Sequence, residues 1–152
     1  METRPGMDLR TPLWIALAGA VPFVWFSIYI AFEWTSDVPY MLHLLLSYSA
    51  VMFAFLAGAH WGFAILHARE NPSTARIMMY ESAGAALLAF LITTISTSHL
   101  QLLAFAFLYA FIWGIDSLLY NNKIIPLWFF NVRGIVTPIV VVSMYVAYFS
   151  VI

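Results

Sequence analysis

Long apolar runs separated by short polar segments dominate this 152-residue chain. A helix needs about 20 apolar residues to cross the hydrocarbon layer of a bilayer, and runs of about that length recur along the whole sequence. They lack the alternating pattern of barrel strands, so we predict an all-α, polytopic membrane protein with a five-helix bundle. The predicted single domain covers residues 13–152 after a short cytoplasmic segment, 1–12, and its helices span residues 13–32, 41–66, 77–96, 100–120 and 129–152.

Composition agrees with lipid as the main solvent. Hydrophobic residues make up 64% of the chain and charged residues 9%, whereas an average soluble domain is about 25% charged. The net charge of -1 gives no sign of nucleic-acid binding. Because there is no cysteine, disulfides, thiolate metal sites and cysteine nucleophiles are excluded, and the four histidines lack zinc-finger spacing. The sequence therefore predicts no metal site.

The segment "ALAGA", residues 16–20, resembles the end of a signal peptide. The apolar run that precedes Ala18 in this segment is only five residues long, Leu13 to Leu17, shorter than the h-region of about 7 to 15 residues that a signal peptide needs. We therefore expect the first helix to be retained as an anchor.

Basic residues define an orientation for the bundle. All of them fall before the first predicted helix, between the second and third, or around the turn between the fourth and fifth, while the opposite loops carry none. The positive-inside rule then puts the N-terminus in the cytoplasm and the C-terminus outside. The location that we expect, a bacterial inner membrane, is implied by the family resemblance described below. The basic residues are Arg4, Arg10, Arg69, Arg76, Lys123 and Arg133.

Rare polar residues in the predicted helices fall at similar depths. At about 1.5 Å per residue, His60 lies about 9 Å and Glu81 about 6 Å from the cytoplasmic ends of their helices. Asp116 and Arg133 lie about 7 Å from the same side. Such groups usually face the bundle interior and pair there, so with Trp61 they form a candidate polar cluster in the inner leaflet.

Structural explanations of the same residues stay open. A turn folds the fifth helix beside the fourth, so Asp116 and Arg133 are expected to form an ion pair without further function. Arg133 alternatively snorkels to lipid headgroups, and Glu81 alternatively faces water beside Arg76. A histidine such as His60 commonly packs against a neighbouring carbonyl instead of binding a metal or relaying protons.

Small residues predict where helices approach closely. Ala54, Gly58 and Gly62 repeat every four residues and form a helix-packing ridge on a different face from His60. Pro22 and Pro138 fall inside the first and fifth helices, where each removes a backbone hydrogen bond.

Three segments resemble a family of uncharacterised bacterial and mitochondrial membrane proteins that includes transmembrane protein 69. They are "GAVPF", "FLAGAHWGFAI" and the spaced set that runs from Asp116 through Pro126, Trp128 and Arg133 to Thr137. The likeness covers nearly the whole chain, but the third helix has "YESAGAALL" where the family suggests a proline-containing start. The resemblance implies the architecture and no activity, substrate or cofactor.

Two functions remain open. The chain is predicted to be an accessory, assembly or stabilising component of a larger membrane complex, or to self-associate. The resemblance to a family with mitochondrial members suggests that such a complex is respiratory. The alternative is binding or transport of a lipid, a quinone or a proton-coupled solute at the polar cluster. Since no catalytic motif, nucleotide loop or metal-ligand set is present, an enzyme is the less favoured class. The expected partners include membrane lipid and no nucleic acid, and the cofactor is left unassigned.

Reporter fusions at Ile152 test the orientation. Because every basic residue lies on the other side, an alkaline phosphatase fused there should be active and a green fluorescent protein should stay dark. A fluorescent, phosphatase-negative fusion would reverse the assignment.

Overall fold

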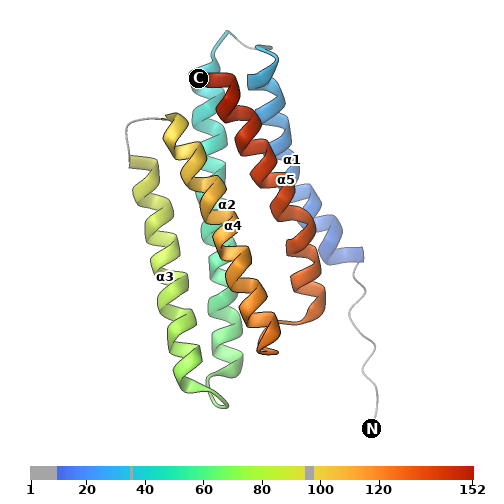
Figure 1. Cartoon of the computed structure of the whole chain (residues 1–152), viewed down its shortest axis with the longest axis vertical. Helices are drawn as coiled ribbons and strands as arrows, with labels where there is room; N and C mark the ends of the chain where they lie inside the picture. Colours follow the sequence, from blue (N-terminus) through green and yellow to red (C-terminus); the bar gives the residue numbers. More distant parts are fainter. Residues whose placement is uncertain (1–9, 35, 95–97) are drawn as a thin grey trace.

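The structure, a computed structural model, describes residues 10–34, 36–94 and 98–152 (Figure 1). Within these ranges it contains helices and no strand, and five helices are long and apolar enough to cross a membrane. The predicted all-helical fold is thus confirmed for the described residues. The helices are α1 (Arg10–Ala31), α2 (Val38–His67), α3 (Pro72–Thr94), α4 (Ser98–Asn121) and α5 (Leu127–Val151).

Helix starts differ from the apolar runs because caps lie outside them. Helix α2 begins three residues before the predicted position 41, where the Asp37 side chain accepts a hydrogen bond from the backbone N–H of Tyr40 at 3.0 Å. Helix α3 begins at Pro72, five residues before position 77, and the side chain of Asn71 accepts from the N–H of Thr74 at 3.3 Å. Its polar first turn is invisible to a search for hydrophobic runs, and a proline does open this helix.

The helices run alternately up and down (Figure 1). The start of α1, the α2–α3 turn and the α4–α5 turn point to the lower end of the view, and the C-terminus lies at the other end. Helix α2 packs against α1, α3 and α4, while α5 packs against α1 and α4. Helix α3 therefore lies at an edge of the bundle. The described basic residues lie in or near the three segments at the lower end: Arg10, Arg69, Arg76, Lys123 and Arg133.

Two apolar clusters fill the interior. The larger includes Phe53 of α2 and Ile112 of α4. The smaller includes Ala64 of α2 and Leu119 of α4. His60 and Asp116 fall between these positions on the same two helices, so a polar layer separates the apolar clusters.

Helices α1 and α4 end with a residue in the left-handed region, at Glu33 with φ 52° and Lys123 with φ 59°. After α4, the N–H of Lys123 donates to the backbone carbonyl of Tyr120 at 2.9 Å, and the N–H of Ile124 donates to the backbone carbonyl of Leu119 at 2.9 Å. This is the Schellman pattern, in which glycine is usual because it has no Cβ to clash. The position carries backbone strain at a non-glycine residue.

We expect Lys123→Gly to be about 1 kcal/mol more stable than Lys123→Ala, because both lose the charge and only alanine keeps the strained Cβ. Thermal unfolding of both variants in lipid nanodiscs measures the difference. Equal melting temperatures would contradict the strain.

Candidate functional site

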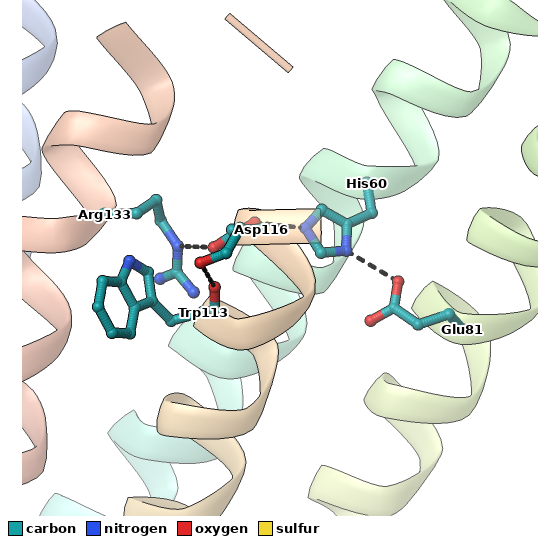
Figure 2. Close-up of polar contacts among 6 residues, drawn as sticks. His60, Glu81, Trp113, Asp116 and Arg133 are labelled. Atoms are coloured by element: carbon teal, nitrogen blue, oxygen red, sulfur yellow. Dashed lines mark hydrogen bonds and ion pairs between the residues drawn. The ribbon is translucent and has the colours of Figure 1, made fainter. Parts of the chain in front are cut away.

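Four ionisable side chains from four helices join into one hydrogen-bonded series, here called the ion chain (Figure 2). Glu81 Oε2 of α3 lies 2.8 Å from His60 Nδ1 of α2. His60 Nε2 lies 2.7 Å from Asp116 Oδ1 of α4. Arg133 Nε of α5 donates to Asp116 Oδ2 at 2.8 Å. The order across the bundle is therefore Glu81, His60, Asp116, Arg133.

Helical periodicity explains why His60 and Asp116 point inward. His60 follows buried Phe53 by seven residues and precedes buried Ala64 by four. Asp116 similarly follows Tyr109 by seven residues, and Tyr109 is also buried. Residues three, four or seven apart share a helix face, so these polar side chains project from the faces that form the core.

Burial divides the ion chain into an inner part and one more accessible end. His60 and Asp116 are almost completely buried, and Arg133 is 4% exposed. The side chain of Glu81 is 21% exposed on the edge helix α3. Glu81 is therefore the member best placed to exchange a proton with the surroundings.

The geometry around His60 determines how many protons the site holds. Both ring nitrogens lie at hydrogen-bond distance from a carboxylate oxygen. An ionised carboxylate only accepts, and a neutral imidazole has one N–H. Each of the two gaps therefore needs its own proton, carried by the ring or by a carboxyl group. With one proton in each gap, Glu81, His60 and Asp116 together carry a charge of -1. The Arg133 guanidinium carries +1, so the net charge of the ion chain is zero.

An apolar groove adjoins the Arg133 end of the ion chain and has a volume of about 350 Å³. We call it the Arg133 groove. It lies among α1, α2, α4 and α5, and its lining includes Phe23, Phe55, Tyr109, Trp128, Arg133 and Thr137. The hydroxyl of Thr137 is buried there without a hydrogen-bond partner among the described residues.

The structure does not bring every candidate residue together. Trp61 follows His60 directly, yet it is 44% exposed and has no described hydrogen bond to the ion chain. Gly58 and Gly62 are also exposed, and a Cβ added to either would meet no atom within 4 Å. At these two glycines, the ridge that includes Ala54 therefore does not pack against another described helix. That the ridge packs against a helix of another chain stays a prediction. Within the described ranges, no cluster of histidine and acidic side chains has the arrangement of a metal site.

Tyr109 and Thr137 were not singled out as site residues from the sequence. Tyr109 donates its hydroxyl to the carbonyl of Ser49 at 2.9 Å and contributes to the groove wall. Spacing is the signal that was available, because Tyr109 precedes Asp116 by seven residues and Thr137 follows Arg133 by four.

A family described as "Protein of unknown function (DUF3429)" matches residues 9–149. The chain belongs to the DUF3429 family. The match includes all four residues of the ion chain, so the site lies within the matched region. No curated protein and no solved structure matches this DUF3429 chain.

A double-mutant cycle tests the pair at the centre of this DUF3429 site. Asp116→Asn and Arg133→Gln should each cost about 3 to 5 kcal/mol, because each leaves a buried charge without its partner. The double variant should lose less than the sum, with a coupling of about 1 to 3 kcal/mol in thermal unfolding in nanodiscs. Strict additivity would reject the pair.

Proposed function

We propose that this DUF3429 protein is a multi-pass membrane protein that binds a small molecule beside its ion chain and couples that binding to a proton. The observation that supports the proposal best is the position of His60 between two carboxylates from different helices. A structural ion pair needs only Asp116 and Arg133. The extension through His60 to Glu81 adds two further proton-binding groups within the membrane-spanning helices, where a charge costs about 2.5 to 3.5 kcal/mol at the helix centre and less near the ends.

The proton coupling has a specific route. With Glu81 protonated and His60 neutral, Glu81 gives its proton to Nδ1 while Nε2 gives its proton to Asp116. The two protons are conserved, and Asp116 becomes neutral beside Arg133. The interaction between Asp116 and the Arg133 guanidinium then weakens, because an ion pair has become a hydrogen bond to a neutral carboxylic acid. Proton movement at Glu81 is thereby linked to the Arg133 groove.

The orientation and location remain part of the proposal. The described basic residues share one end of the bundle, which supports a cytoplasmic N-terminus and a bacterial inner membrane. In that orientation the ion chain lies in the inner leaflet. The kinship with transmembrane protein 69 rests on the sequence segments quoted above, and it would extend the same site to a mitochondrial membrane.

A second candidate function is accessory or stabilising, within a larger and respiratory membrane complex or in a self-associated form. The open space at Gly58 and Gly62 favours it, because a small-residue ridge lets another helix approach closely. This function requires no chemistry at the ion chain, and it is compatible with ligand binding on the other side of α2.

Glu81→Gln tests whether the outer gap holds a proton. The glutamine amide donates to a bare Nδ1, so the chain remains bonded and neutral with one proton fewer. Wild type should show either a protonated Nδ1 in the nitrogen-15 spectrum of His60 or a protonated carboxyl band in the infrared. Glu81→Gln should show neither.

The matched control is Glu70→Gln, which neutralises an exposed glutamate in the α2–α3 turn. Its spectra should equal those of wild type, and His60→Gln assigns the ring signals among the four histidines. If Glu81→Gln and wild type give the same spectra, Glu81 shares no proton with His60 and the proposed coupling is wrong.

A further inference from the structure

We infer that the Arg133 groove binds a neutral, flat, carbonyl-bearing ring with an apolar chain, which is the chemistry of a membrane quinone. The inference deepens the proposed function, on which it rests, by naming the class of ligand. It concerns binding alone and requires no electron transfer.

Arg133 supplies the donors. Its one described hydrogen bond uses Nε, which leaves the four N–H groups of the two terminal nitrogens unengaged among the described side chains (Figure 2). Arg133 also lines the groove. Guanidinium donors without acceptors are costly in an apolar interior, so an acceptor atom placed in the groove would be stabilising.

Thr137 supplies an independent polar contact one turn further along α5. It is 3% exposed and lines the groove, and its hydroxyl has no described partner. A threonine in a helix can satisfy its hydroxyl on the carbonyl four residues earlier, as Ser143 does with Ile139 at 2.8 Å. Thr137 does not, so its buried hydroxyl still lacks the partner that a ligand reaching it from the groove would supply.

Charge complementarity favours a neutral headgroup. With two shared protons the ion chain sums to zero, and the Arg133 charge is already compensated by Asp116. An anionic headgroup would bring an uncompensated charge close to that carboxylate in a medium of low dielectric constant. A carbonyl oxygen accepts the same N–H groups without that cost.

The shape of the groove favours a ring with a chain. Its volume of about 350 Å³ lies within the range of about 300 to 1,000 Å³ typical of ligand pockets. Its wall on α5 runs from Trp128 to Val140, or about 18 Å of helix. Arg133 lies near the middle of this wall and Thr137 lies one turn closer to Val140, while the α1 and α2 sides of the groove are lined by apolar residues such as Ile15, Met52 and Leu56. A ring held at Arg133 and Thr137 could therefore direct its tail along these apolar sides. The more accessible aromatic side chains of the lining, Phe55 and Trp128, are available to pack against a flat ring.

Decylubiquinone titrated into the protein in phosphatidylcholine nanodiscs tests the inference, with bound ligand counted by native mass spectrometry. Wild type should bind one equivalent. Ala16→Leu fills the groove and should weaken binding at least about tenfold, while Thr137→Val removes one hydrogen bond and should weaken it about three- to tenfold. Ala18→Leu is the matched control, because Ala18 is exposed on the same helix outside the groove, and it should bind as wild type does. Melting temperatures of the three variants verify folding.

Three results would overturn the assignment. They are no stoichiometric binding to wild type, equal binding to wild type and Ala16→Leu, and tight retention of phosphatidylglycerol that decylubiquinone does not displace. The spectra of Glu81→Gln contain no added ligand, so the two proposals fail separately. Loss of a proton in Glu81→Gln together with no quinone binding would reject the ligand class alone.

Discussion

The structure depends on the cost of holding the Asp116 carboxylate away from water. Asp116 is fully buried between the two apolar clusters, where an unpaired charge is expensive. Both of its oxygens are engaged, one by His60 and the other by Arg133. Because these partners come from α2 and α5, the requirement fixes α4 between them. The carboxylate thus stabilises one rotation and one depth of three helices, which apolar packing alone specifies less sharply.

Much of the fold is readable from the sequence because five apolar runs of membrane-spanning length leave little choice of architecture. The predicted helix ends were less accurate where a polar cap or a polar first turn extends a helix beyond its apolar run, as at Asp37 and Pro72. The depth of each polar residue was also readable, since rise per residue needs no knowledge of neighbouring helices. That argument brought His60, Glu81, Asp116 and Arg133 to one level.

The bonding order was not readable in the same way. Depth says nothing about rotation, so the central place of His60 between two acids needed the packed bundle. Trp61 shares the level of His60 but lies about 100° further round the helix, which directs it outward. The ridge at Gly58 shows a second limit of prediction from sequence. Small residues at this spacing indicate that another helix can approach closely, but they do not say whether that helix belongs to the same chain.

The direction of the ion chain has an electrical consequence. The hydrogen bonds pass from α3 through α2 and α4 to α5, from helix to helix across the bundle (Figure 2). In a bilayer the helices lie roughly along the membrane normal, so a proton moving through this series travels roughly parallel to the membrane plane. Transmembrane voltage does work only on charge that moves along the normal, about 2.3 kcal/mol per elementary charge per 100 mV over the full membrane. The internal proton shift is therefore nearly silent to voltage, and only the entry and exit of protons at the Glu81 end of the series would respond to the membrane potential.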